Sequence, residues 1–267
     1  MRCWSGTHDS ITPALHRPIR KDAAVKLLAA KGLTKVYSGR AVVNNVDFEI
    51  HSGEIVGLLG QNGAGKTTAF RMTIGMITPT RGRVFFHEED ITRLPMYLRA
   101  RRGMGYLSQE PSIFQRLTVT QNVLAVLETL KYTRGERLKI AQQLLDELGL
   151  HKVLKSRAYT LSGGERRRLE ICRALSTNPS LILLDEPFSG VDPLAVSDIQ
   201  AIITNLRKRG IGILLTDHNV RDTLEVTDRA YIIHEGKILV SGTPEVIVKD
   251  EVAKEVYLGK KFEDMEF

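Results

Sequence analysis

The sequence of 267 residues is poor in the features that mark secreted or membrane-embedded proteins. Its only two cysteines, Cys3 and Cys172, cannot form a disulfide framework, which favours a reducing compartment. No apolar run approaches the roughly 18 residues needed to cross a bilayer. The first twenty residues hold no continuous apolar segment, so we do not expect a secretory signal. Cys172 stands among apolar positions of helical spacing and is expected in the core.

Aromatic residues are also scarce, at 6% of the chain, although the net charge is +7. A basic balance can serve nucleic acid, an anionic membrane surface or a bound triphosphate. The basic residues are spread along the chain apart from short clusters at residues 99–102 and 166–168, and no basic tract is interleaved with aromatics. Nucleic-acid binding is therefore possible but not indicated.

The most informative stretch is residues 55–68, which read IVGLLGQNGAGKTT. The apolar residues 55–59 predict a buried strand, and the glycine, lysine and threonine spacing that follows is that of a phosphate-binding P-loop. Glycines let successive N–H groups turn toward an anion, and the helix that starts near the lysine adds its positive end. The predicted nucleotide-binding residues are Gly60, Asn62, Gly63, Ala64, Gly65, Lys66, Thr67 and Thr68.

The rest of the chain predicts an α/β fold. Residues 25–37 and 41–50 indicate two antiparallel strands, and residues 230–243 indicate a hairpin. The other apolar strands alternate with helical patterns, which favours a mainly parallel core sheet with helices on both faces. Helical periodicity between residues 119 and 154 predicts a helical subdomain, about residues 110–175, inserted into this core.

The two ends of the chain differ in their predicted order. Residues 1–24 lack periodicity and are expected to form a poorly ordered extension ahead of one domain over residues 25–267. From residue 244 to about residue 258 we expect a helical tail.

Polar residues follow two of the predicted strands. Asp185 and Glu186 end the run LILLDEP, and His218 ends the run GIGILLTDH. Ligands of parallel sheets gather at the carboxyl ends of the strands. We therefore expect these side chains beside the P-loop. The segment LSGGE over residues 161–165 opens another helix, with Ser162 as N-cap and Glu165 completing a capping box.

Five elements thus follow one another: Tyr37, the P-loop, YLSQ, LSGGE, and LILLDEP with SGVD and a strand ending in histidine. In this order they resemble the ATP-binding subunits of ABC transporters, over about residues 26–243. The resemblance implies the P-loop NTPase fold of ABC ATPases, with an antiparallel β subdomain beside the core sheet. It also implies ATP and Mg²⁺ as cofactors and ATP hydrolysis coupled to transport across a membrane.

The resemblance assigns a role to each matching residue of the catalytic site. Thr67, Asp185 and Gln109 would contact Mg²⁺, and Gln109 would also report the state of the nucleotide to a membrane partner. Glu186 would polarise or deprotonate the attacking water, which requires a fixed carboxylate near the γ-phosphate. His218 would contact the γ-phosphate, although a lone histidine is more often structural.

The same resemblance predicts a head-to-tail homodimer. Tyr37 would stack on adenine, unless it is an ordinary core tyrosine. The signature residues would face the ATP of the opposite subunit, with Asp192 near the shared interface. These signature residues are Ser162, Gly163, Gly164 and Glu165.

Several stretches, among them SIFQRLTV, DHNV and the ending VYLGKKF, are most similar to the ATPases of lipopolysaccharide export transporters. This similarity implies two integral membrane subunits as partners and a place on the cytoplasmic face of the inner membrane. Phe114 and Arg116 would contact a membrane subunit, unless Phe114 packs into the helical subdomain. Two residues depart from the pattern: Gln61 stands where proline is usual, and Gln115 where we expect arginine.

Two alternatives remain at this point. The ATPases of branched-chain amino acid importers share the short length of this chain. ABC ATPases that act on DNA or ribosomes share the motifs, but they carry a long coiled coil or two cassettes in one chain. Only one cassette is present here, and the stretch between Lys66 and Ser162 is too short for such a coiled coil. We therefore expect a transport ATPase that reaches the membrane through partner subunits, with no nucleic acid.

Overall fold

The computed structural model describes residues 25–258. The expected N-terminal extension and the last part of the ending VYLGKKF lie outside the described residues. Within residues 25–258, no helix combines the length and the apolar character that crossing a membrane requires.

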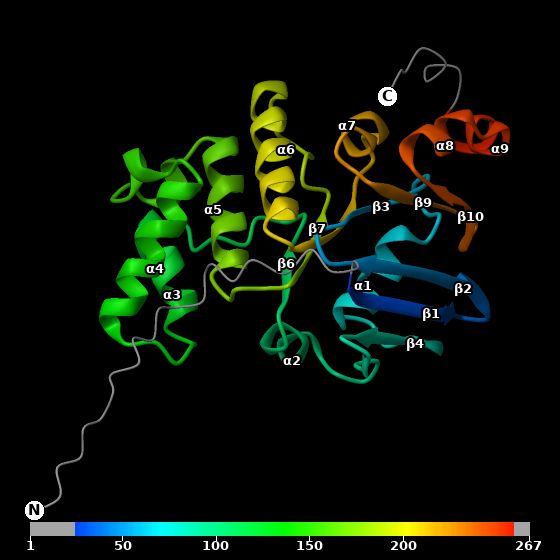
Figure 1. Cartoon of the computed structure of the whole chain (residues 1–267), viewed down its shortest axis with the longest axis horizontal. Helices are drawn as coiled ribbons and strands as arrows, with labels where there is room; N and C mark the ends of the chain where they lie inside the picture. The colour runs from blue at the N-terminus through cyan, green and yellow to red at the C-terminus, as the bar shows by residue number, and fades with distance from the viewer. Residues whose placement is uncertain (1–24, 259–267) are drawn as a thin grey trace, which may run out of the picture.

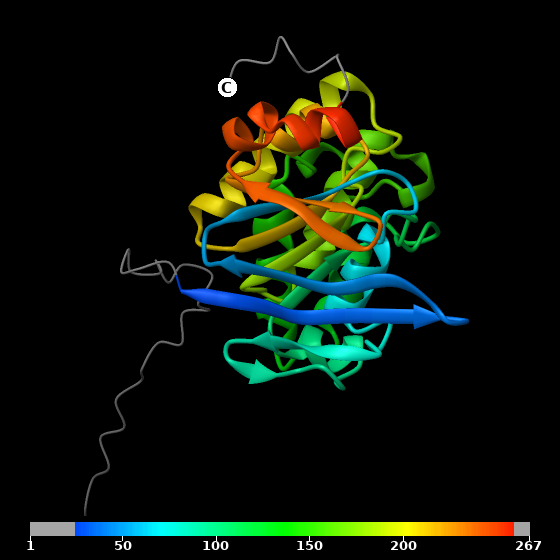
Figure 2. The ribbon, with the colours of Figure 1, turned by 90° about the vertical axis from the view of Figure 1, so that its right-hand side faces the viewer.

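The strands form two sheets (Figures 1 and 2). The first sheet is antiparallel, in the order β2-β1-β4-β5. Its strands are β1 (Lys26–Tyr37), β2 (Arg40–His51), β4 (Arg81–Phe86) and β5 (Glu89–Asp90). Ser38 and Gly39, both with positive φ, make the turn between β1 and β2. A turn with two positive φ values suits the twist of an antiparallel hairpin.

The second sheet is the core sheet, in the order β10-β9-β3-β8-β7-β6. All of its neighbouring strands are parallel except the hairpin of β9 and β10. Every residue of β3, β7 and β8 is buried, which explains their unbroken apolar runs. The fold class predicted from the sequence is confirmed. The strands are β3 (Ile55–Leu59), β6 (Met104–Leu107), β7 (Leu181–Asp185), β8 (Gly212–Thr216), β9 (Arg229–His234) and β10 (Lys237–Gly242).

Two helices link the sheets to each other and to the rest of the fold. The helix α1 (Lys66–Ile74) follows β3 and contacts β1 and β2 of the first sheet as well as β8 of the core sheet. The short helix α2 (Met96–Arg101) precedes β6 and contacts it. Arg99, which is fully buried in α2, donates to the carbonyls of Met72 and Thr73 in α1. The core thus includes a charged side chain, Arg99, whose donors are satisfied by backbone carbonyls.

Three helices pack together at the end of the molecule opposite the first sheet (Figure 1). They are α3 (Val119–Leu127), α4 (Arg134–Glu147) and α5 (Gly163–Leu175). Each begins with a capping box, at Thr118, Thr133 and Ser162 respectively. These boxes satisfy N–H groups that the first turn of a helix leaves unpaired. Cys172 is buried in α5, as expected, and burial raises the pKa of its thiol.

The helices that follow β7 contact the core sheet: α6 (Pro193–Lys208) contacts β8, α7 (Val220–Leu224) contacts β3, and α8 (Pro244–Lys249) and α9 (Glu251–Ala253) contact β10. A π-helical turn over Lys254–Leu258 follows α9. The expected helical tail is therefore helical but broken. Asp250 has an extended backbone and its side chain accepts from the N–H of Ala253, so it ends one helix and caps the next.

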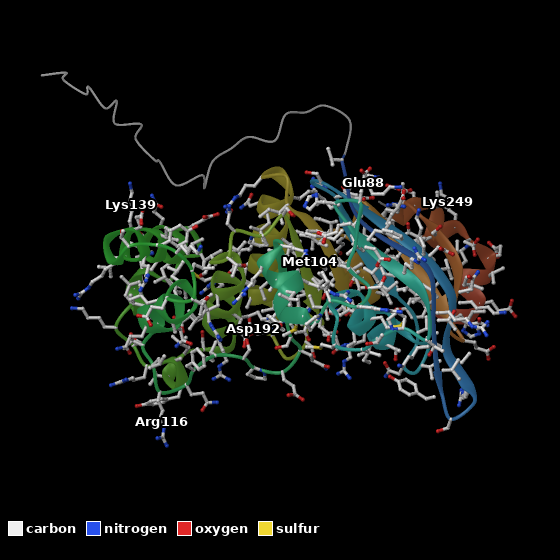
Figure 3. All side chains as sticks on the ribbon, turned by 90° about the horizontal axis from the view of Figure 1, so that it is seen from below. Glu88, Met104, Arg116, Lys139, Asp192 and Lys249 are labelled. Atoms are coloured by element: carbon white, nitrogen blue, oxygen red, sulfur yellow. The ribbon has the colours of Figure 1, made fainter. Side chains whose placement is uncertain are left out.

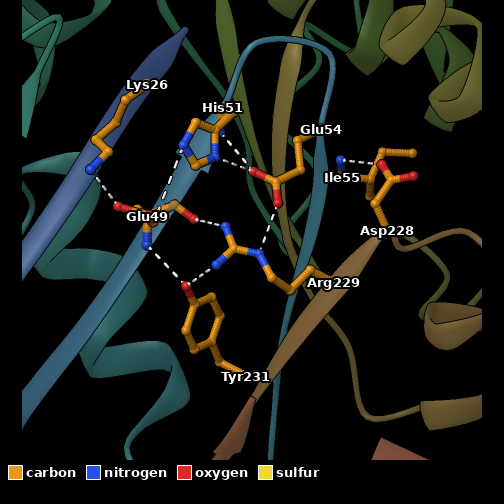
Figure 4. Close-up of polar contacts among 8 residues, drawn as sticks. All are labelled: Lys26, Glu49, His51, Glu54, Ile55, Asp228, Arg229 and Tyr231. Carbon is orange, nitrogen blue, oxygen red and sulfur yellow. Dashed lines mark hydrogen bonds and ion pairs between the residues drawn. The ribbon is translucent and has the colours of Figure 1, made fainter. Parts of the chain in front are cut away.

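A polar cluster, called here the clasp, joins β2 to β9 near the start of β3 (Figure 4). It consists of Glu49, His51, Glu54, Arg229 and Tyr231. The Arg229 guanidinium donates to the Glu54 carboxylate at 2.8 Å, to the Glu49 carbonyl at 3.0 Å and to the Tyr231 hydroxyl at 2.6 Å. His51 Nδ1 lies 3.0 Å from the same Glu54 carboxylate. The clasp therefore ties the two sheets together through charged groups that are paired with one another.

Candidate nucleotide site

The P-loop connects the end of β3 to the start of α1. Gly60, Gly63 and Gly65 all have positive φ, which other residues adopt at a cost. A Cβ atom on Gly60 would lie 2.1 Å from the carbonyl oxygen of Ile233 in β9, and one on Gly65 would lie 2.7 Å from that of Val42 in β2. The loop is thus pressed against backbone on two sides, and glycine is the residue that fits there.

Lys66 is the first residue of α1 and is buried. Its ammonium group donates to the carbonyls of Gly60 and Gln61, the latter at 2.9 Å. Burial lowers the pKa of Lys66, while the nearby carboxylates of Glu186 and Asp217 act in the opposite direction. A buried cation held mainly by carbonyl oxygens is well placed to bind an anion such as a phosphate.

The rest of the loop combines exposed and buried positions. Asn62, Gly63 and Thr67 are exposed, Thr68 is half-buried, and Ala64 is buried. The backbone N–H of Gly236, in the turn between β9 and β10, donates to the Ala64 carbonyl at 2.9 Å. The open face of the loop and the N-terminus of α1 are therefore accessible to solvent, in an arrangement that suits an anion.

Glu186 follows β7 and lies at the centre of the polar groups beyond the core strands. Its backbone has a φ of 48°, and its N–H donates to the Thr216 carbonyl at 2.7 Å. The Gln109 side chain donates to its carboxylate at 2.7 Å, and His218 Nδ1 lies 3.5 Å from the same oxygen. The structure thus brings together three predicted site residues that follow β6, β7 and β8, three neighbouring parallel strands.

The three residues predicted to hold a metal ion all offer oxygen atoms as ligands. Asp185 ends β7, is buried, and accepts from the Thr216 hydroxyl at 2.9 Å. Thr67 lies in the first turn of α1, and Gln109 follows β6. Within residues 25–258, no cluster of three His, Cys, Asp or Glu side chains could hold a metal by itself. A single carboxylate with hydroxyl and amide oxygens fits Mg²⁺, which completes its octahedron with water and phosphate oxygens.

Two residues that the sequence did not single out support this arrangement. Arg167, buried in α5, donates to the carbonyls of Ser108, Glu186 and Pro187 at 3.0 to 3.2 Å. It therefore fixes the backbone just before Gln109 and around Glu186. The sequence showed it only as part of a basic cluster, although Glu170 one turn later is its ion-pair partner at 2.9 Å.

Asp217 is the second such residue. It is fully buried, and its carboxylate accepts from the N–H groups of Phe188 at 3.1 Å and Asn219 at 2.9 Å. It lies 3.4 Å from His218 Nδ1. Asp217 therefore ties the segment that follows β8 to the segment that follows β7. Its position just before the histidine was the only sign in the sequence.

The signature segment lies at the N-terminus of α5. Ser162 and Glu165 form the predicted capping box, in which the Glu165 carboxylate accepts from the Ser162 N–H at 2.9 Å. A Cβ atom on Gly164 would lie 3.0 Å from the Cβ of Ala195, and Asp192 caps α6 through the Ala195 N–H. Two helix N-termini therefore adjoin here. Among the described residues, no hydrogen bond or ion pair joins this segment to the P-loop of the same chain.

The remaining predicted residues lie on the surface, and the structure does not bring them into contact with Lys66 or Glu186. Tyr37 is 45% exposed, with the Lys35 ammonium 5.1 Å from its ring centre, so it is not a core tyrosine. Phe114 is 49% exposed, and the Arg173 guanidinium lies 4.6 Å from its ring centre. Arg116 is exposed and points away from the body of the protein (Figure 3).

Comparisons with known proteins agree with this geometry. The family model described as ABC transporter matches residues 43–189. The chain is 54% identical to the lipopolysaccharide export system ATP-binding protein LptB of Acidithiobacillus ferridurans, over 89% of this chain and 99% of that protein. It is also 54% identical to LptB of Haemophilus influenzae, with the same two shares covered.

A solved structure supports the same relationship. A nucleotide-free ATP-binding cassette from an ABC transporter superposes with a TM-score of 0.80 at 27% identity, covering 88% of this chain and all of that one. The matched family model includes the P-loop and the segment through Glu186. The chain therefore belongs to the family of ATP-binding proteins of ABC transporters, and it is an ATPase of that family.

Proposed function

We propose that this chain is the ATP-hydrolysing subunit of a lipopolysaccharide export transporter. In this proposal it acts as a head-to-tail homodimer beneath two integral membrane subunits, on the cytoplasmic face of the inner membrane. The cargo rests on the identity to LptB proteins over almost their whole length. The chemistry rests above all on Glu186, which is held by Gln109 and His218 at the end of a buried strand.

In the proposed site the P-loop N–H groups and Lys66 hold the phosphates of ATP. Lys66 would exchange its two carbonyl partners for phosphate oxygens. Thr67, Asp185 and Gln109 would hold Mg²⁺, whose charge offsets that of the phosphates. Tyr37, half exposed at the end of β1, offers its ring to adenine.

For hydrolysis, Glu186 accepts a proton from the water that attacks the γ-phosphate. The carboxylate must be fixed for this role, and the Gln109 amide holds one of its oxygens at 2.7 Å. His218 approaches the same oxygen and would contact the γ-phosphate from the end of β8. Arg167 and Asp217 act as positioning residues, because they bind the backbone at and just after Glu186.

The second half of each site is assigned to the partner subunit. Ser162, Gly163, Gly164 and Glu165 form a helix N-terminus, which suits a phosphate, yet no contact in this chain joins them to the P-loop. Head-to-tail pairing would bring them to the ATP of the opposite subunit. Asp192 would lie near that interface, because it caps the neighbouring helix α6.

The contact with the membrane subunits is assigned to Phe114 and Arg116. The backbone of Phe114 is held on both sides by Asn122, which accepts from its N–H at 2.8 Å and donates to its carbonyl at 3.0 Å. Its ring is nevertheless half exposed. A fixed backbone that presents an exposed aromatic ring is suited to anchor a partner helix.

This proposal is tested by isolating the tagged chain from membranes of its own organism and identifying the integral membrane proteins that copurify. We expect the two membrane subunits of lipopolysaccharide export. Phe114→Ala should weaken assembly by about 30-fold, the effect of losing an aromatic anchor. ATPase activity of the isolated chain and its melting temperature should stay near the parent values. Tyr97→Ala, which removes another exposed aromatic on α2, serves as the control.

Two results would contradict the proposal. Permeases of a branched-chain amino acid importer in the purified complex would assign the chain to the alternative class of transporter. A fall of many degrees in the melting temperature of Phe114→Ala, with assembly retained, would assign Phe114 to the packing of the helical subdomain.

A further inference from the structure

The turn Lys254–Leu258 is far from the P-loop in the sequence but lies against it in the structure. It follows α8 and α9, which contact β9 and β10 beside the P-loop strand (Figures 1 and 2). The sequence predicted only that this tail is helical. Two contacts connect this turn to the P-loop and to the residue just before it.

The first contact is made by Gln61, the second residue of the P-loop. Its side-chain amide donates to the carbonyl of Val256 at 2.5 Å. Gln61 itself is exposed, and its own carbonyl accepts from Lys66 at 2.9 Å. Proline, the residue expected here from the sequence pattern, could not make this bond because its side chain has no donor. The link therefore depends on a side chain in which this chain departs from that pattern.

The second contact is made by Tyr257, which packs against an apolar cluster that includes Leu59, the last residue before the loop. Its hydroxyl is buried and has no hydrogen-bond partner within the described part of the chain. Burial raises the pKa of Tyr257 to about 12, while the neighbouring backbone of Gly60 acts in the opposite direction. Tyr257 thus lies beside the first turn of the loop while Gln61 binds the adjacent carbonyl.

We propose that the turn Lys254–Leu258 is a brace for the P-loop, with Gln61 and Tyr257 as positioning residues for nucleotide binding. A glycine-rich loop loses conformational freedom when it closes around an anion. A loop already held in its curled form loses less on binding, so its affinity for the ligand is higher. The turn between β9 and β10 holds the loop at Ala64, and the brace holds it at the other end. This inference rests on the proposed nucleotide site.

The brace is tested with Gln61→Met in the full chain, because methionine keeps the length of glutamine but has no donor. The probe is fluorescently labelled ADP. We expect binding to weaken by about fivefold, the effect of losing one neutral hydrogen bond. The KM for ATP should rise by a similar factor, and the turnover number should change less than the KM, since the Gln61 side chain is assigned to positioning the loop. Amide hydrogen exchange over residues 60–65 should become faster.

Tyr257→Ala provides the second variant, and the double variant tests whether the two residues act together. If Gln61 acts through the tail, Gln61→Met should add almost nothing to the loss of affinity in a Tyr257→Ala chain. Gln142→Met makes the same substitution on the exposed face of α4, where glutamine binds Asp146, and should leave ADP binding unchanged.

Three results would overturn the inference. ADP affinity of Gln61→Met equal to that of the parent would show that the contact does not act on the loop. A full effect of Gln61→Met in the Tyr257→Ala chain would show that Gln61 acts without the tail. A parent chain that binds no ADP would contradict the proposed function itself, and the brace with it.

Discussion

Charged side chains from other segments lie near both ends of the strand β3, and the two groups have different partners. At its start, Arg229 of the clasp donates to the Glu54 carboxylate, and Asp228 accepts from the Ile55 N–H at 2.9 Å. At its far end, Lys66 donates to loop carbonyls, and Glu186 accepts from a neutral amide of Gln109. Removing one member of a buried pair of opposite charges leaves the other unpaired and destabilises the fold, whereas charges held by neutral groups remain available to a ligand.

The pKa shifts of Glu54 and Lys66 support this difference between the two ends of β3. Burial raises the pKa of Glu54, but hydrogen bonds from Arg229 and His51 outweigh it and leave the pKa below its ordinary value. For Lys66, burial dominates and lowers the pKa, despite nearby carboxylates. The clasp therefore stabilises the charged forms of Glu54 and Arg229, while the nucleotide end holds a cation at a cost that a bound phosphate would relieve.

The largest effect is expected at the nucleotide end. Lys66→Ala removes the phosphate-binding ammonium, and Ser162→Arg blocks the signature helix, so each variant alone should be inactive. In a head-to-tail dimer, an equal mixture of the two should restore roughly a quarter of the sites, one in each heterodimer. Steady-state ATPase activity of the mixture measures this directly. A mixture as inactive as its parents, once heterodimers are shown to form, would contradict composite sites that work independently.

A smaller effect, on stability alone, is expected at the clasp. Arg229→Met should lower the free energy of unfolding by about 2–3 kcal/mol, because a charged donor is lost and its acceptors remain. The melting temperature should fall by roughly 5–10 °C. The KM for ATP should not change. Arg221→Met, which breaks an exposed ion pair with Glu225, should change stability by less than about 0.5 kcal/mol. Equal losses in both variants would remove the distinction between the clasp and a surface ion pair.

The smallest expected effect is the loss of stability of the clasp at acidic pH. The hydrogen bond from Lys26 lowers the pKa of Glu49, and the pKa of Glu54 is lowered as described above. A carboxylate with a depressed pKa in the folded state adds stability above its unfolded pKa of about 4.3, and this is lost as pH falls through the folded value. The free energy of unfolding, measured with urea at pH 7 and pH 4, should fall more between these two pH values in the parent than in Arg229→Met. A parallel loss would contradict the clasp as an acid-sensitive element.

The nucleotide end could be predicted from the sequence because its parts are local motifs. The spacing of the P-loop and the buried runs before Asp185 and His218 fix both strand type and strand end, and parallel pairing brings those ends together. The clasp carries no such motif. The Glu49 N–H binds the Tyr231 hydroxyl across 182 positions of sequence, and no periodicity reveals that pairing.

Other contacts were missed for related reasons. Arg167 binds backbone carbonyls after β7, and a carbonyl leaves no trace in the sequence of its partner. The break at Asp250 depends on a local cap, which competes with a helical pattern that continues across it. The brace joins Gln61 to Val256, so it required the path of the whole chain.

The most direct test of the account is the ATP turnover of Glu186→Gln. The amide keeps the size of the side chain but cannot accept the proton of the attacking water. We expect turnover to fall by about 10²–10⁴-fold, while ATP still binds, the melting temperature stays near the parent value and an ATP-bound dimer accumulates on sizing chromatography. Turnover within about tenfold of the parent would contradict the assignment of catalysis to this end of the sheet.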